Sequence, residues 1–358
     1  MAEYHFLPRQ ELHRLLDRLI MAGFHCIGPQ VGDGAIIYDV LDDVAALPRG
    51  VRDSQAPGSY RLAAGGDERC FAWANGPQAL KPLTFAPREG LWRAEQGKGY
   101  TPEPLHDTPT AIIGVRACDL AALHIHDLHF RSNDPYYAAR RERLFLVAVN
   151  CSHPAATCFC ASTGDGPEAQ FGYDLVLDEL DDGYIVRSGT PVGGHILREL
   201  YLEPASAEQV GMAEQQNAAA AAQQTRTLPG RNLRATLFAN LEHARWDNVA
   251  ARCLSCGNCT SVCPTCFCHS ERDEPALDGR SSVHYRQWDS CFTEGHSYIH
   301  GVVIRAETKF RYRQWLTHKL GSWHDQYGRS GCVGCGRCIS WCPAAIDITE
   351  EAAAICTV

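Results

Sequence analysis

Cysteine is the residue type that offers most chemistry in this sequence, which has 18 cysteines among 358 residues. Eight of them form two runs with the same spacing, Cys-x-x-Cys-x-x-Cys-x-x-x-Cys-Pro. The runs are Cys253, Cys256, Cys259 and Cys263 before Pro264, and Cys332, Cys335, Cys338 and Cys342 before Pro343. Bacterial ferredoxins hold [4Fe-4S] clusters with this spacing. The sequence therefore predicts two such clusters.

In two-cluster ferredoxins the fourth cysteine of each run binds the cluster of the other run. Crossed ligation predicts one cluster on Cys253, Cys256, Cys259 and Cys342, and a second on Cys332, Cys335, Cys338 and Cys263. Zinc is the alternative. A zinc site takes four ligands from two Cys-x-x-Cys pairs, which leaves the third cysteine and the Cys-Pro step of each run unexplained.

A third group of cysteines follows two expected strands. Cys118 comes after residues 110–115, and Cys151 comes after residues 144–150, with Cys158 and Cys160 close behind. Ligands of open α/β sheets collect at the carboxyl ends of the strands. We therefore predict a third [4Fe-4S] cluster on these four thiols. The alternative is that they serve as small buried apolar side chains. That interpretation suits Cys118 better than it suits Cys158 and Cys160, which lie in a polar loop.

The remaining cysteines give weaker signals. Cys266, Cys268 and Cys291 are one ligand short of a cubane, so His269, Asp289 or an external ligand must complete any fourth metal site. The interpretation preferred here is that they surround the neighbouring clusters and tune their potentials. The isolated cysteines are interpreted as structural: Cys26, Cys70 and Cys356. No Walker loop and no G-x-G-x-x-G occurs, so we assign no catalytic residue and expect no NAD, FAD or nickel on this chain.

The elements that must position these thiols form two expected parts. Apolar residues at helical spacing predict a helix over residues 8–22, and apolar runs predict strands over 35–41, 110–115 and 144–150. Continuous apolar strands followed by helix starts indicate a parallel sheet. A hairpin is expected over 173–186, and residues 42–107 are expected to form loops and short strands.

The second part contains both cysteine runs. Helices are expected over 206–226, 231–250 and 306–323, with little strand between the runs. The predicted fold class is α+β, with an N-terminal α/β domain over 1–205, a helical linker over 206–230 and a helical dicluster ferredoxin domain over 231–358.

Composition excludes several classes of protein. A net charge of −9 argues against nucleic-acid binding, which needs a basic face. The first residues lack an uninterrupted apolar core, and no run of 18 apolar residues occurs, so we expect a cytoplasmic protein without a membrane span. The cytosol keeps thiols reduced, which favours metal ligation over disulfides.

Five segments in order resemble one known family. They are GVRACDL, NCSHPAATCFC, CGNCTSVCPTCFC, RQWDSCF and GCVGCGRCISWCP, and they run from about residue 110 to 348. The sequence resembles the β subunit of cytoplasmic NAD(P)-linked [NiFe] sulfhydrogenases, and is similar to the A subunit of anaerobic sulfite reductase in the same wider family. His269 and Ser270 depart from the pattern, where Phe and an acidic residue are expected.

The resemblance implies an electron-relay subunit that is not catalytic alone. Its implied partners are a subunit with FAD and a [2Fe-2S] cluster that binds NAD(P), and the small and large hydrogenase subunits, or a sirohaem subunit in a sulfite reductase. Two alternatives come from other classes. One is a cluster-based sulfur or disulfide reductase that uses Cys266, Cys268 and Cys291, and the other is a scaffold or redox sensor.

Overall fold

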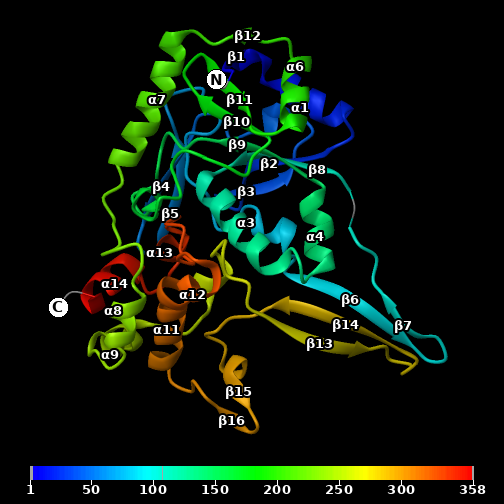
Figure 1. Cartoon of the computed structure of the whole chain (residues 1–358), viewed down its shortest axis with the longest axis vertical. Helices are drawn as coiled ribbons and strands as arrows, with labels where there is room; N and C mark the ends of the chain where they lie inside the picture. The colour runs from blue at the N-terminus through cyan, green and yellow to red at the C-terminus, as the bar shows by residue number, and fades with distance from the viewer. Residues whose placement is uncertain (1–2, 107, 357–358) are drawn as a thin grey trace.

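The structure is a computed structural model that describes residues 3–106 and 108–356. Figure 1 shows a large sheet at the top, a smaller sheet at the lower right and a group of short helices at the lower left. Within the described residues, no helix is long and apolar enough to cross a membrane.

The large sheet has eight strands in the order β12-β1-β11-β10-β9-β8-β2-β3. Their bounds are β1 His5–Pro8, β2 His25–Gly32, β3 Ala35–Val40, β8 Thr110–Val115, β9 Leu144–Val149, β10 Leu175–Glu179, β11 Gly183–Ser188 and β12 Glu203–Pro204. Strands β2, β8, β9 and β10 run parallel, while the outer pairs are antiparallel. The predictions of parallel strands over 110–115 and 144–150, and of a hairpin after them, are confirmed.

Helices cover both faces of this sheet. On one face lie α1 (Leu12–Met21) and α6 (Pro191–Glu199), and on the other lie α3 (Ala117–Phe130) and α4 (Pro135–Glu142). The side chains of β8 alternate accordingly, so that Ile113 packs on the first face and Ile112 on the second. The leucines of α1 are buried at helical spacing, but Ile20, expected on the same apolar side, is 41% exposed.

The smaller sheet is antiparallel, in the order β13-β14-β6-β7. Its strands are β6 Arg88–Glu95, β7 Gly99–Pro102, β13 His269–Pro275 and β14 Ser281–Trp288. The prediction of little strand between the two cysteine runs is therefore wrong. Strand β13 has no apolar face to bury, because both of its faces are largely exposed. Its sequence therefore shows none of the apolar alternation from which a strand is predicted. Pairing of β14 with β6 also crosses the expected boundary at residues 206–230.

The remaining C-terminal chain forms short helices around a separate core. They are α8 Arg234–Ala239, α9 Arg245–Arg252, α10 Asn258–Ser261, α11 Thr308–Thr317, the π-helical turn η4 His318–Ser322, α12 Trp323–Tyr327, α13 Arg337–Ser340 and α14 Ile348–Cys356. Trp246, Trp315 and Leu316 are the large side chains at the centre of this core. A helical stretch over 306–323 is thus confirmed.

The expected linker is also helical. Helix α7 (Ala207–Ala222) begins with a capping box in which Ser206 and Gln209 satisfy each other's backbone amides. It packs on the large sheet, where Asn217 Nδ2 donates to Asp178 Oδ1 at 2.8 Å. The residues after α7 lie beside the loop of Cys158 and Cys160, because Gln224 Nε2 donates to Cys160 Sγ at 3.3 Å.

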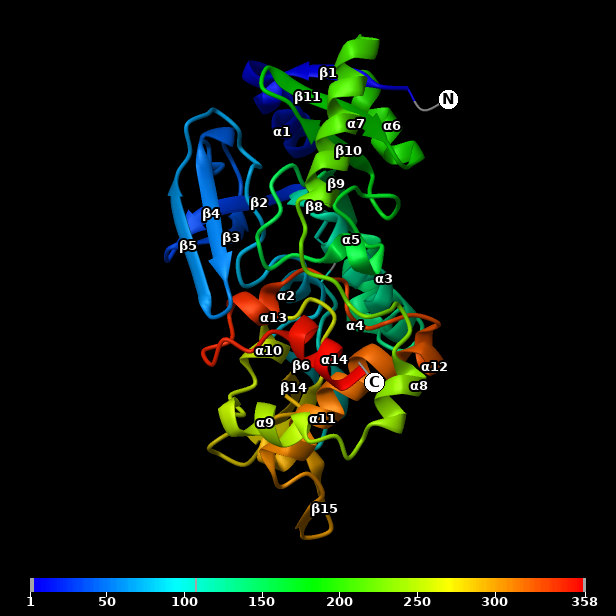
Figure 2. The same ribbon diagram turned by 90° about the vertical axis from the view of Figure 1, so that its left-hand side faces the viewer.

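A long hairpin joins the two parts. It consists of β4 (Val51–Ala56) and β5 (Ser59–Ala64), and Figure 2 shows it beside β3 of the large sheet with its turn beside α13. At that turn Gly58 N donates to Ile339 O at 3.0 Å, and Tyr60 stacks on Trp341 with ring centroids 5.1 Å apart. The shorter elements are η1 Arg9–Glu11, η2 Val44–Ala46, α2 Lys81–Thr84, α5 Cys160–Thr163, η3 Glu294–Ser297, β15 Tyr298–Ile299 and β16 Val302–Val303.

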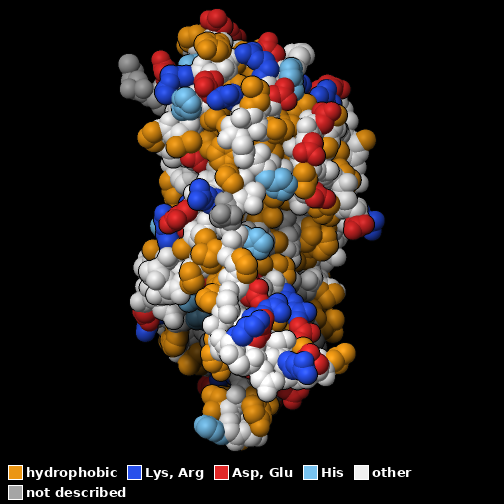
Figure 3. Space-filling view, turned by 90° about the vertical axis from the view of Figure 1, so that its right-hand side faces the viewer, with side chains coloured by type: hydrophobic (Ala, Val, Ile, Leu, Met, Phe, Trp, Pro, Cys, Tyr) orange, Lys and Arg blue, Asp and Glu red, His pale blue; other side chains and the backbone are white. Residues whose placement is uncertain are grey.

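The surface carries charges of both signs. On the face shown in Figure 3, Lys and Arg lie among Asp and Glu rather than in a single basic stripe. The hairpin of β15 and β16 projects at the lower end of the molecule and exposes four large apolar side chains, Tyr298, Ile299, Val302 and Ile304. Such a projecting apolar tip is a feature of surfaces that contact other proteins.

Candidate metal centres

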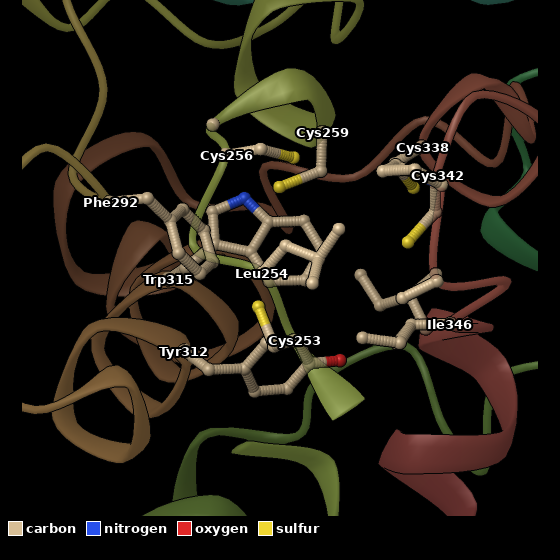
Figure 4. Close-up of a pocket in the computed structure, with 14 residues that line it drawn as sticks. Cys253, Leu254, Cys256, Cys259, Phe292, Tyr312, Trp315, Cys338, Cys342 and Ile346 are labelled. Carbon is tan, nitrogen blue, oxygen red and sulfur yellow. The ribbon is translucent and has the colours of Figure 1, made fainter. Parts of the chain in front are cut away.

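The four cysteines of the first predicted ligand set line one cavity, here called the first site. They are Cys253, Cys256, Cys259 and Cys342. In Figure 4 the sulfurs of Cys256 and Cys259 lie at the upper centre, that of Cys253 at the lower centre and that of Cys342 at the right. The structure thus brings together the first predicted ligand set, including the cysteine that crosses over from the second run.

The loop of the first run is shaped by backbone torsions that are rare outside glycine. Ser255 has a φ of 50° and Gly257 a φ of 75°, so the chain curls tightly between α9 and α10. This curl turns a backbone amide toward sulfur, because Ser255 N donates to Cys253 Sγ at 3.4 Å. A [4Fe-4S] cluster accepts hydrogen bonds of this kind at its sulfurs, which stabilise its negative charge.

Two buried donors point to an anionic occupant of the first site. Tyr312 and Trp315 line the cavity, and neither Tyr312 Oη nor Trp315 Nε1 finds a hydrogen-bond partner among the described residues. An unsatisfied buried donor costs about 1–3 kcal/mol. A sulfur-rich cluster supplies acceptors at this position, so the donor set fits a [4Fe-4S] group.

The second site comprises Cys332, Cys335, Cys338 and Cys263, which are close enough to affect one another's ionisation. Burial raises the pKa of the Cys332 and Cys338 thiols. A buried thiol stays protonated at neutral pH unless a metal cation replaces its proton. Bound iron does so and holds the sulfur as a thiolate. The predicted second ligand set is therefore also brought together.

Two buried lysines stand beside this site without a carboxylate. Lys319 is 3% exposed, and its Nζ donates to Thr265 Oγ1 at 2.8 Å and to Gly331 O at 3.4 Å. Lys81 is 6% exposed and lies 3.9 Å from the centre of the Trp288 ring. Neither lysine makes an ion pair with a carboxylate in the part of the chain that the structure describes. A buried cation needs a compensating negative charge, which a cluster with four thiolates provides.

The third site is a cavity whose lining includes Cys118, Cys151, Cys158 and Cys160. Cys118 lies in the first turn of α3 after β8, and Cys151 follows β9, so adjacent parallel strands deliver them to one edge of the sheet. Burial raises the pKa of each of these four thiols. The structure thus assembles the third predicted set as well.

Arg116 gives the third site a buried positive charge. Its side chain lines the cavity, is 2% exposed and donates to the carbonyls of Phe71 at 2.7 Å and Trp73 at 2.8 Å. Its Nε has no partner among the described residues. The hydrogen bonds of Arg116 all go to backbone oxygens, so an anionic group held by the thiols fits beside it.

The second site lies between the other two. Cys338 also lines the first cavity, and Cys335 also lines the third. The loops are in direct contact, because Phe159 N donates to Gly334 O at 2.8 Å. A Cβ at Gly334 would lie 2.5 Å from the Phe159 carbonyl, and one at Gly336 would lie 2.5 Å from Thr157 O. Glycine at these two positions is what allows the approach.

An ion pair fixes this junction. Arg337 of the second run and Asp119 of α3 are each 1% exposed, and Arg337 Nη1 lies 2.9 Å from Asp119 Oδ1. The Arg337 Nε also donates to Gly76 O at 3.2 Å. A buried pair of this kind fixes the relative position of two elements. Here it holds the segment of the third site against that of the second.

Sequence reasoning did not find these charged residues. The cysteine-containing segments include Arg116, Asp119 and Arg337. A charged residue flanked by apolar residues and cysteines is the one sequence signal that could have indicated their burial. Lys81 and Lys319 lie outside those segments, and nothing in the sequence near them indicates burial. Their role depends on contacts that only the fold creates.

The other cysteines do not join these three sites. Cys266 lies against Cys263, while Cys268 contacts Cys291. His269 and Asp289 were the expected candidates for a fourth ligand. His269 Nδ1 faces Phe267 O at 3.1 Å, and Asp289 Oδ2 faces His296 Nδ1 at 3.3 Å. Of the three isolated cysteines, Cys26 and Cys70 are buried and Cys356 is partly buried.

Comparison with known proteins agrees with this geometry. Residues 252–346 match the family model of a 4Fe-4S dicluster domain. The chain is 31% identical over 274 residues to Sulfhydrogenase 2 subunit beta of Pyrococcus furiosus, which covers 75% of this chain and 79% of the relative. This chain belongs to the sulfhydrogenase β-subunit family. No solved structure matches it.

Membership confirms the resemblance seen in the sequence. The chain is an iron–sulfur electron-transfer subunit, and its dicluster domain carries [4Fe-4S] clusters. The matched domain spans both cysteine runs together with β13, β14 and α11. The third site lies outside the matched segment, so its assignment rests on the geometry alone.

Proposed function

We propose that this chain relays single electrons through three [4Fe-4S] clusters, held in a row by the first, second and third sites. The observation that carries the proposal is the sharing of cavity walls. Cys335 borders the third site and Cys338 the first, although both belong to the second ligand set. When bound, each cluster accepts and returns one electron.

The protein's own residues then set the path. Buried aromatic side chains, Phe292, Tyr312 and Trp315, exclude water from the first site. Arg116 and Lys319 place a positive charge at the third and second sites, which favours acceptance of an electron. The first site has no buried cation in its lining and reaches the surface at the exposed Cys256, so it forms one end of the row.

The partners follow from the family. The relative is named as a subunit of a sulfhydrogenase. We propose that this chain lies in a cytoplasmic complex between a subunit with FAD and a [2Fe-2S] cluster that binds NAD(P) and the small and large subunits of a [NiFe] hydrogenase. The flavin, the nucleotide and the nickel centre belong to those partners. The equivalent place in an anaerobic sulfite reductase is the second candidate, and the relative's name favours the first.

The test uses the assembled complex with Cys338→Ser, which breaks the middle ligand set. Hydrogen-dependent NAD(P)⁺ reduction needs the whole path, while NAD(P)H-dependent dye reduction and hydrogen-dependent dye reduction each need one partner. We expect the first activity to fall at least tenfold and the other two to remain. Full hydrogen-dependent NAD(P)⁺ reduction in a complex that has lost the middle cluster would refute the relay. Co-purification of a sirohaem subunit instead of hydrogenase subunits would select the second candidate.

A further inference from the structure

Two thiols outside the three sites lie in contact. Cys268 immediately precedes β13, and Cys291 lies three residues after β14. These strands pair in antiparallel register, with His269 opposite Trp288, and Asp289 N donates to Cys268 O at 2.9 Å. The ladder therefore brings the two ends together, and the side chains of Cys268 and Cys291 interact directly.

A histidine completes the group. His296, in η3, hydrogen-bonds to Cys268, while its Nδ1 lies 3.3 Å from Asp289 Oδ2. The carboxylate thus orients the ring so that Nε2 is the nitrogen left for sulfur. The hydrogen bond with Cys291, and then that with His296, lower the pKa of Cys268. One thiolate and one thiol, beside an imidazole, is the arrangement of a reactive cysteine pair.

The geometry suits sulfur chemistry better than a fourth metal centre. The thiols of the first and third sites line cavities, whereas the side chains of Cys268 and Cys291 interact with each other. Cys268, Cys291 and His296 are all partly exposed, and the His296 side chain is 24% exposed, so a small molecule can reach them.

We propose that Cys268 and Cys291 form a redox-active dithiol, with His296 as its acid and base, that reduces organic disulfides. The Cys268 thiolate attacks one sulfur, the substrate S–S bond breaks, and the leaving thiolate takes the His296 proton. His296 then accepts the Cys291 proton, and the Cys291 thiolate attacks Cys268 Sγ. That attack releases the second substrate thiolate, which is protonated by His296, and leaves a Cys268–Cys291 disulfide.

Return to the dithiol takes two electrons and two protons. In sum, one disulfide, two electrons and two protons give two thiols. The electrons come from the relay, so this last step rests on the proposed function. The structure supplies a short connection, because Cys266 is two residues from Cys268 and lies against Cys263 of the second site. The dithiol is thus a branch from the middle of the row.

The first test needs no relay. The full chain is purified without oxygen, treated with bis(2-hydroxyethyl) disulfide, alkylated and digested, and the peptides are analysed by mass spectrometry. We expect a Cys268–Cys291 cross-link with unchanged iron content. The absence of this cross-link, with both thiols alkylated, would overturn the proposal. A chain without iron would refute the proposed function, but the cross-link would still test the dithiol.

The second test measures turnover. The chain is photoreduced, and reoxidation of its visible absorbance by the same disulfide is followed in Cys268→Ser, Cys291→Ser and His296→Asn. We expect each cysteine variant to be at least tenfold slower, and His296→Asn to be slower by roughly 10²-fold, the usual effect of a lost general acid. Cys356→Ser, which changes a partly buried cysteine outside the group, is the matched control. Equal rates in all variants, or loss of a bound metal from Cys268→Ser, would contradict the proposal.

Discussion

The charge on Lys319 provides the sharpest prediction about the second site. Burial disfavours this charge, yet the neighbouring sulfurs of Cys263, Cys266 and Cys332 outweigh that penalty and raise the Lys319 pKa. Because the reduced cluster carries one more negative charge than the oxidised one, the lysine stabilises the reduced state more. Lys319→Met removes the charge with little change in volume, so the midpoint potential of the second cluster should fall.

The size of the fall follows from the hydrogen bonds. Lys319 Nζ lies 2.8 Å from Thr265 Oγ1, and Thr265 Oγ1 lies 3.2 Å from Cys263 Sγ, so Nζ and this sulfur are no more than 6.0 Å apart. With an effective dielectric constant of about 20, unit charges about 6–8 Å apart interact by roughly 2–3 kcal/mol. For a one-electron couple this corresponds to roughly 90–120 mV, because about 59 mV is a tenfold change in the equilibrium constant.

The assay is a redox titration followed by electron paramagnetic resonance. Lys309→Met is the control, because Lys309 lies on the neighbouring α11 but pairs with Asp247 at 2.9 Å on the surface. We expect one of the cluster signals to shift in Lys319→Met and none to shift by more than about 20 mV in the control. Unchanged potentials in Lys319→Met, with all iron retained, would refute the assignment of this lysine to the second cluster.

Three further predictions concern single positions. Gly334→Ala places a Cβ 2.5 Å from the Phe159 carbonyl at a φ of 65°, so we expect the third site to lose its iron, about four atoms per chain. Tyr312→Phe removes an unpaired buried hydroxyl, which should stabilise the cluster-free chain to urea by about 1–3 kcal/mol and lower the potential of the first cluster. Burial lowers the pKa of His126 to about 3, so between pH 6.5 and 5.5 only the unfolded chain takes up its proton. The apparent free energy of unfolding should therefore fall by about 1 kcal/mol over that unit, and His126→Phe should remove this loss.

Each of these changes has a matched control. Gly328→Ala has a similar φ of 71° but nothing within 4 Å of the added Cβ, so full iron loss there as well would show strain rather than the Phe159 contact as the cause. Tyr327→Phe removes a hydroxyl that is already paired with His129, and an equal gain in stability would contradict the role assigned to the unpaired Tyr312 hydroxyl. His195→Asn changes an exposed histidine. If this variant also removed the loss of unfolding free energy between pH 6.5 and 5.5, His126 would be ruled out as the source of that loss.

The cysteine sets could be predicted because their chemistry is written in local spacing. Two runs of fixed spacing and two strands that are each followed closely by a cysteine were enough to name twelve residues, and the structure gathers them into three groups. The same holds for buried strands, since a short continuous apolar run such as Leu144–Val149 is typical of a strand that is covered on both faces.

Other features depend on contacts between distant parts of the chain. The strand Ser281–Trp288 is partly buried only because it pairs with Arg88–Glu95, nearly two hundred residues earlier in the sequence. Its polar sequence gives no strand signal by itself. The burial of Lys319 and the approach of Gly334 to Phe159 are likewise created by packing, and the N-terminal region takes part through Asn75, which lines the third site.

Iron analysis tests the central claim of three clusters most directly. The chain, purified without oxygen, should contain about twelve iron atoms and about twelve acid-labile sulfides, four of each for every [4Fe-4S] cluster. Cys158→Ser removes one ligand of the third site and should leave about eight of each. About eight irons in both the unaltered chain and Cys158→Ser would contradict the account, because the third site would then hold no cluster.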